Sequence, residues 1–89
     1  MTKAVFDRVS ELTKVPPNVL RHVGGMRHES ASRHLIMYIL NQRGYSLTEI
    51  QQQFKHASHT PIKHGIAMAK KRIADNPYWT ELARLAQAV

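Results

Sequence analysis

The chain has 89 residues, and its 13 Lys and Arg outnumber its 6 Asp and Glu, so the formal net charge of +7 favours a polyanionic partner. Because the chain contains no cysteine, a disulfide framework and a thiolate metal site are excluded, as is typical of a cytoplasmic protein. Its longest apolar run, residues 35–40, is far shorter than the roughly 20 residues of a membrane span, and the N-terminal residues have no signal-peptide pattern. We therefore expect no membrane association. A chain of this length is expected to form a single domain, over residues 1–89.

The first third of the chain predicts two helices and a loop. Apolar residues at helical spacing indicate an amphipathic helix from about residue 3 to residue 14. Two prolines end that pattern and open a short helix over residues 18–22, which a glycine pair stops. Residues 24–32 carry little apolar bulk, two glycines and two serines, so we expect a loop whose last serines cap the next helix.

A central helix is predicted over residues 33–43. The apolar run within it, residues 35–40, is wider than one helical face, which implies that neighbouring elements cover it on several sides. A run this short is also compatible with a strand, but helices flank it and no partner strand is visible elsewhere. We therefore expect the buried core of an all-α domain here.

Three more helices follow the central one. Ser46 and Glu49 have the Ser-x-x-Glu spacing of a capping box, which predicts a helix reaching about residue 54. Residues 55–57 form a tight connection to a basic amphipathic helix of about four turns that begins near Ser58. Asp-Asn-Pro at residues 75–77 ends that helix and caps the last one. The pattern as a whole predicts a compact domain of about six helices.

The fourth and fifth predicted helices, of about 8 and 15 residues with a connection of about three or four, have the anatomy of a helix-turn-helix. The first residues of the second helix in such a motif read base edges in the major groove. Here they combine hydroxyl, imidazole, ammonium and apolar groups that suit base edges and phosphates: His59, Thr60, Pro61, Lys63 and His64. The alternative is an ordinary helical hairpin whose lysines are solvated.

Three stretches carry longer motifs. They are Arg-His-Leu-Ile-Met-Tyr-Ile-Leu at 33–40, Ser-Leu-Thr-Glu-Ile at 46–50 followed by Phe54, and Lys-His-Ala-Ser-His-Thr-Pro-Ile-Lys-His at 55–64. Over about residues 4–86 the chain thereby resembles the C-terminal DNA-binding domain (domain IV) of the bacterial replication initiator DnaA. The corresponding family segments are Arg-Gln-x-Ala-Met-Tyr-Leu-Ala, Ser-Leu-Pro-x-Ile-Gly-x-x-Phe and Gly-Gly-Arg-Asp-His-Thr-Thr-Val-x-His.

The resemblance implies a Trp-repressor-like helix-turn-helix that binds duplex DNA in replication initiation or its regulation, in the bacterial cytoplasm or nucleoid. In that family the Asp-His-Thr-Thr segment reads bases, a basic loop before the central helix reaches the minor groove, and the arginine that starts this helix meets phosphate. With the flanking cations included, the expected DNA-contacting residues are Arg27, Arg33, Lys55, His56, Ser58, His59, Thr60, Pro61, Lys63 and His64.

Departures from the family signature concentrate in the base-reading segment. Ser58 stands where the family has an acid, and Pro61 stands where it has a second threonine. Ala57 replaces the arginine, Lys55 and His56 replace the glycine pair, and the basic loop keeps only one arginine. Since the changed side chains offer different hydrogen bonds, we expect an altered or relaxed base preference with phosphate contacts retained.

Other classes of function are disfavoured. The glycine pair at 24–25 lacks the Lys-Ser or Lys-Thr of a phosphate loop, and the acidic residues are scattered singly, so we expect no enzyme, no cofactor and no small-molecule substrate. The spacings of His56, His59 and His64 do not place them on one helical face, so we expect no metal site.

Several biological roles stay open. The chain is expected to be either a stand-alone DnaA-like protein or the excised terminal domain of a divergent initiator. Within DNA binding, the alternative is a transcriptional regulator. The alternative from another class of function is a protein-interaction adaptor, which docks on a replication initiator or another replication protein and needs no DNA.

Overall fold

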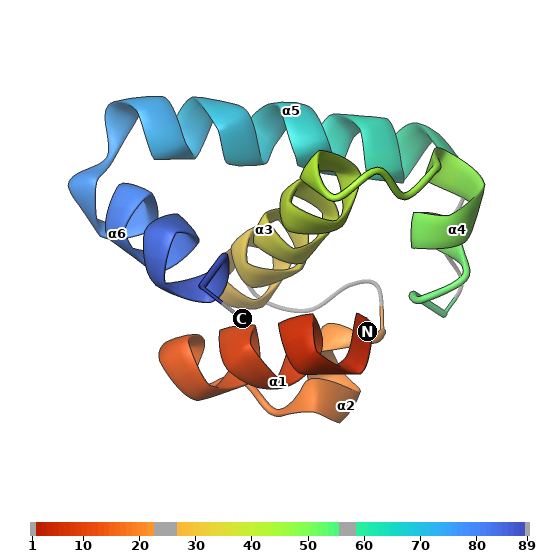
Figure 1. Ribbon diagram of the computed structural model, residues 1–89, viewed down its shortest axis with the longest axis horizontal. Coiled ribbons are helices and arrows are strands. Elements are labelled where there is room, and N and C mark those ends of the chain that lie inside the picture. Colours follow the sequence, from red (N-terminus) through yellow and green to blue (C-terminus); the bar gives the residue numbers. More distant parts are fainter. Residues whose placement is uncertain (1, 23–26, 56–58, 89) are drawn as a thin grey trace.

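Helix α3 is the central element of the fold, and the other helices surround it (Figure 1). The computed structural model describes residues 2–22, 27–55 and 59–88, and these residues form six helices. The helices are α1 (Thr2–Thr13), α2 (Pro17–Leu20), α3 (Arg27–Gln42), α4 (Leu47–Gln51), α5 (His59–Asp75) and α6 (Pro77–Ala86). No strand occurs within the described ranges, and the predicted all-α class is confirmed.

The core lies where α3 packs against its neighbours. Figure 1 shows α5 crossing α3 on one side and α1 with α2 on the opposite side. Four apolar side chains of α3 are at most 1% exposed: Leu35, Ile36, Ile39 and Leu40. The wide apolar run therefore marks a helix covered on several sides, as the sequence predicted. None of the described helices is long and apolar enough to cross a membrane.

The start of α3 differs from the prediction. Residues 27–32, which were expected to form a loop, are the first turns of α3, while 23–26 lie outside the described residues. Tertiary packing explains the difference, because Ala31 and Ser32 are buried and the Ser32 hydroxyl donates to the carbonyl oxygen of His28 at 2.8 Å. The serine thus satisfies its hydroxyl inside the helix instead of capping it, and burial outweighs weak helix propensity.

Local signals set the other helix ends. Gly44 has φ of +92° and follows the end of α3, as a left-handed C-terminal position requires. The capping box is present: the Ser46 hydroxyl accepts from the Glu49 amide at 3.1 Å, and the Glu49 carboxylate accepts from the Ser46 amide at 2.8 Å. At the start of α6, the Asn76 side chain accepts from the Tyr78 amide at 2.9 Å. The predictions of the capping box and of the cap at the start of α6 are confirmed.

Candidate nucleic-acid interface

The segment after α4 is anchored to the N-terminal helices. α4 ends at Gln51, earlier than predicted, and a turn carries the chain to Phe54, which is buried. The Lys55 amide donates to the carbonyl oxygen of Arg21 at 2.7 Å, just after α2. The Phe54 ring lies 5.3 Å from the buried ring of Phe6 in α1. These contacts fix the point from which the chain leaves α4 toward α5.

Helix α5 lies close against α3 at Gly65. Ile62, Ile66 and Ala69 are buried on the same side of α5. A Cβ atom on Gly65 would lie only 2.5 Å from Met37 Sδ and 2.8 Å from His34 Cδ2. The glycine therefore permits a close approach of the two helices. Its signal in the sequence was a glycine inside a strong helical pattern, where it normally weakens the helix.

We expect Gly65→Ala to destabilise the protein by about 1–3 kcal/mol, even though alanine favours a helix over glycine by about 1 kcal/mol. The reason is the overlap of the new methyl group with buried side chains of α3. Ala67→Gly, at an exposed position of the same helix, is the matched control and should cost about 1 kcal/mol through propensity alone. Urea denaturation measures both. A stabilised Gly65→Ala would show that α3 and α5 are not closely packed there.

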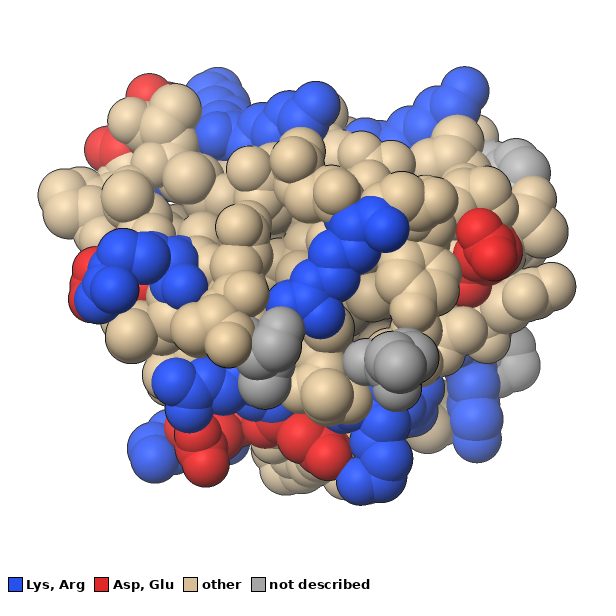
Figure 2. All heavy atoms as spheres, viewed as in Figure 1, with Lys and Arg blue, Asp and Glu red and all other residues tan. Residues whose placement is uncertain are grey.

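The exposed side of α5 carries cations and small side chains. Residues at helical spacing form this surface, which we call the α5 outer face: Thr60, Lys63, His64, Ala67, Lys70, Lys71 and Ala74. It has three lysines, no acid and no bulky apolar group. Figure 2 shows Lys and Arg side chains along the edge formed by α5, with acidic ones only near the C-terminal end of the helix, where Asp75 is exposed. Polyanions are attracted to such a surface.

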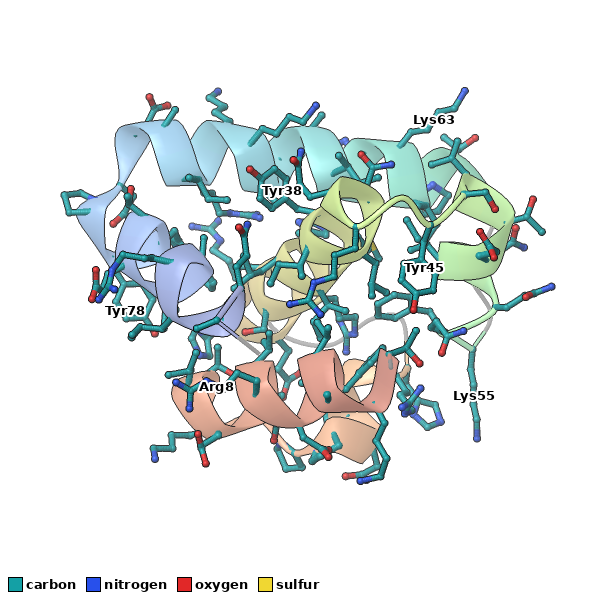
Figure 3. All side chains as sticks on the ribbon, viewed as in Figure 1. Arg8, Tyr38, Tyr45, Lys55, Lys63 and Tyr78 are labelled. Atoms are coloured by element: carbon teal, nitrogen blue, oxygen red, sulfur yellow. The ribbon has the colours of Figure 1, made fainter. Side chains whose placement is uncertain are left out.

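The structure brings together only some of the predicted contact residues. Thr60, Pro61, Lys63 and His64 are all exposed in the first turns of α5. Lys63 points away from the protein at that end, whereas Lys55 points away on the other side of α4 (Figure 3). His56 and Ser58 lie outside the described residues, and of His59 the structure gives only the backbone, at the start of α5.

The two predicted arginines lie on α3 and differ in exposure. Arg27 is exposed and is the first residue of α3, so it is part of a helix and not of a loop. Arg33 is 4% exposed, and its Nη2 donates to the carbonyl oxygen of Val19 in α2 at 3.0 Å. Burial lowers the pKa of Arg33, and the charge of Glu29 opposes that effect. Arg33 is therefore buried, where a surface position was expected, and it links α3 to α2.

A basic pair that sequence reasoning missed lies where α3 crosses α5. The Arg72 guanidinium donates through Nη1 to Nδ1 of His34 at 2.9 Å. Burial, followed by the charges of Arg72, His64 and Arg33, lowers the pKa of His34 to about 4. His34 is therefore neutral near pH 7, as an acceptor for Arg72 must be. Burial and then the charge of Arg27 lower the pKa of Arg72.

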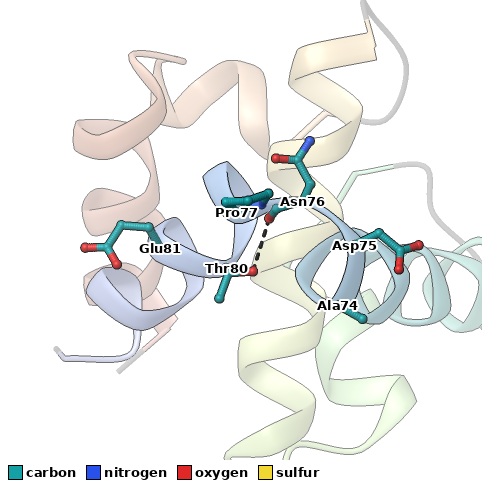
Figure 4. Close-up of a pocket in the computed structure, with 6 residues that line it drawn as sticks. All are labelled: Ala74, Asp75, Asn76, Pro77, Thr80 and Glu81. Atoms are coloured by element: carbon teal, nitrogen blue, oxygen red, sulfur yellow. Dashed lines mark hydrogen bonds between the residues drawn. The ribbon is translucent and has the colours of Figure 1, made fainter.

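Metal and small-molecule sites have little support in the described part of the chain. No group of three His, Cys, Asp or Glu side chains there is placed to hold a metal ion. A shallow hollow of about 350 Å³ lies between the end of α5 and the start of α6 (Figure 4). Its Thr80 hydroxyl already donates to the carbonyl oxygen of Asn76 at 3.1 Å, and Asp75 and Glu81 are exposed at its rim.

No protein-family model matches the chain.

Proposed function

We propose that this protein binds double-stranded DNA by placing α5 in the major groove, with α4 as the first helix of a helix-turn-helix. The α5 outer face carries the proposal. An α-helix with its side chains is about 10–12 Å across, and the major groove is about 12 Å wide. The 17 residues of α5 span about 25 Å at 1.5 Å per residue. This length brings the whole row of lysines on the face alongside the phosphates.

The residues of the face divide into two chemical roles. Thr60 and His64 offer hydrogen bonds, and Pro61, which is exposed beside the face, offers an apolar contact suited to a thymine methyl group. Lys63 and Lys70 supply ammonium groups for phosphates. The alanines on the same face leave room for the helix to approach the bases. An interface of this kind binds all duplexes appreciably and chooses among sequences through the first turns of α5.

The biological role that we propose rests on the resemblance to the initiator domain. It is the initiation of DNA replication or its regulation, in the bacterial cytoplasm or nucleoid, without catalysis. The three motifs at 33–40, 46–50 and 55–64 support it, because they cover the central helix, the capped start of α4 and the start of α5. The proposed partner is duplex DNA, and an initiator that uses the same sites is a further proposed partner.

Neutralising two lysines of the α5 outer face tests the DNA proposal. Lys63→Gln with Lys70→Gln should weaken binding to every duplex by roughly 30-fold at 0.15 M salt and reduce the slope of log affinity against log salt by about 2. Each lost phosphate contact removes about 0.9 of a released counterion. Fluorescence anisotropy with a labelled random duplex, titrated at several salt concentrations, measures both quantities.

The matched control removes the same charge elsewhere. Lys3→Gln with Arg84→Gln neutralises two exposed cations, on α1 and α6, that pair with Asp7 and Glu81. This variant should keep the wild-type salt slope. If both double variants lose the same affinity, net charge alone drives binding and the α5 outer face is not the interface.

A further inference from the structure

The side chains of His34, His64 and Arg72 meet where α3 crosses α5. Together with Arg27, the first residue of α3, we call them the junction cluster. The rings of His34 and His64 lie 6.0 Å apart and perpendicular to one another. Arg72 donates to His34, and the charge of Arg27 acts on Arg72. The cluster thus joins two helices that are far apart in the sequence but are packed together.

The electrostatic surroundings of His34 and Arg72 are basic. Every charged group that shifts the pKa of His34 or Arg72 is basic. The ion pairs Lys3–Asp7, Arg8–Glu11 and Arg84–Glu81 lie on α1 and α6, and the charge of Glu29 acts on Arg33. The charge of Arg27 on the half-buried Arg72 guanidinium is unfavourable, and an anion bound beside Arg72 would offset it.

Arg72 has donors available for such an anion. A guanidinium has five N–H donors in one plane, and among the described residues Arg72 uses one of them, toward His34. Because His34 is itself packed against Gly65, its acceptor nitrogen holds the guanidinium in place. A planar, pre-positioned fork of donors matches the oxygens of a phosphate group.

The cluster also borders the α5 outer face. His64 belongs to both surfaces. At about 100° per residue, Lys63 and Lys70 lie toward one side of that face and Arg72 lies toward the other. A helix in the major groove has one sugar-phosphate backbone on each side, so cations on the two sides of α5 face different strands.

We propose that the junction cluster is a second phosphate-binding site. It contacts the sugar-phosphate backbone on one side of the major groove, while Lys63 and Lys70 contact the backbone on the other side. This proposal rests on the proposed function. Arg72 contacts the phosphate, and Arg27 adds charge at the exposed edge of the site. His34 is a positioning residue that acts through Arg72. Contacts with both backbones would fix the depth and tilt of α5 in the groove. Contacts from the lysines alone would leave both the depth and the tilt free.

Arg72→Gln tests the site, with Lys3→Gln on the opposite side of the molecule as the matched control. Measured by anisotropy over a salt series, Arg72→Gln should weaken duplex binding about fivefold at 0.15 M salt and reduce the salt slope by about 0.9, whereas Lys3→Gln should keep the wild-type slope. If wild type binds duplex and Arg72→Gln behaves like Lys3→Gln, the second site is refuted while the proposed function stands. If wild type does not bind duplex, both fail.

A second measurement tests the site without using the affinity of Arg72→Gln for DNA. Inorganic phosphate titrated into the wild-type protein should shift the NMR signals of the His34 and His64 rings and of the Arg72 guanidinium. The same titration of Arg72→Gln should leave both rings unshifted, and its well-dispersed spectrum would show that it folds. Ring shifts of equal size in both proteins would mean that phosphate does not use Arg72, which would overturn the proposal.

Discussion

Phe6→Ala is expected to lower the free energy of unfolding by about 3–5 kcal/mol, a large part of the total of about 5–10 kcal/mol for a domain of this size. The Phe6 side chain is fully buried, with its ring 5.3 Å from that of Phe54 and the Arg21 guanidinium 4.0 Å from its centroid. Its loss leaves a cavity between α1 and the segment that connects α4 to α5. Urea denaturation followed by circular dichroism measures the change.

Tyr78→Ala is the matched control for this loss. Tyr78 is 50% exposed, and its ring makes an edge contact with Trp79 at 5.2 Å, so we expect a cost of about 1 kcal/mol or less. Equal losses for the two variants would contradict the placement of Phe6 in the core. In DNA titrations, Phe6→Ala should lower only the fraction of folded protein and leave the salt slope unchanged.

Ser58→Asp combined with Pro61→Thr is expected to raise the preference for the initiator family's DNA box by about ten to a few thousandfold. An aspartate accepts a hydrogen bond from cytosine N4, and a threonine adds a hydroxyl beside its methyl group. A good base contact discriminates by roughly 1–3 kcal/mol, so restoring one or two gives that range. Pro61 is exposed in the first turn of α5, where a missing amide costs no helical hydrogen bond, so the replacement is structurally mild.

Titrating the wild type and this double variant against the box and a scrambled duplex, at one salt concentration, measures the preference. The affinity of both proteins for the scrambled duplex should be similar, because the lysines of the α5 outer face are unchanged. A wild type that already prefers the box a thousandfold would contradict the account of the departures at these two positions.

Predictions from short-range signals agree with the structure. The capping box at Ser46 and Glu49 and the Asn-Pro start of α6 each depend on residues within one turn of each other. Their chemistry is therefore readable without knowledge of the fold. The wide apolar run of α3 also identified the core correctly, since only a helix covered on several sides has such a pattern.

Features that depend on tertiary packing could not be read from the sequence. Residues 27–32 have the composition of a loop, but burial of Ala31 and Ser32 makes them helical. Arg33 looked like a surface cation, yet it bonds to a carbonyl of α2. The pairing of His34 with Arg72 joins positions 38 residues apart, and only the packing of α3 on α5 brings them together. No local pattern identifies such a pair.

The central claim is that duplex DNA binds to the exposed side of α5. Chemical-shift mapping on the ¹⁵N-labelled protein tests it most directly, because each amide reports on its own surroundings. Adding a short duplex at low salt should shift the signals of residues 59–74 and leave those of α1, on the opposite side of α3, nearly unchanged. Shifts over α1 with α5 unaffected, or no shifts at all, would contradict the claim.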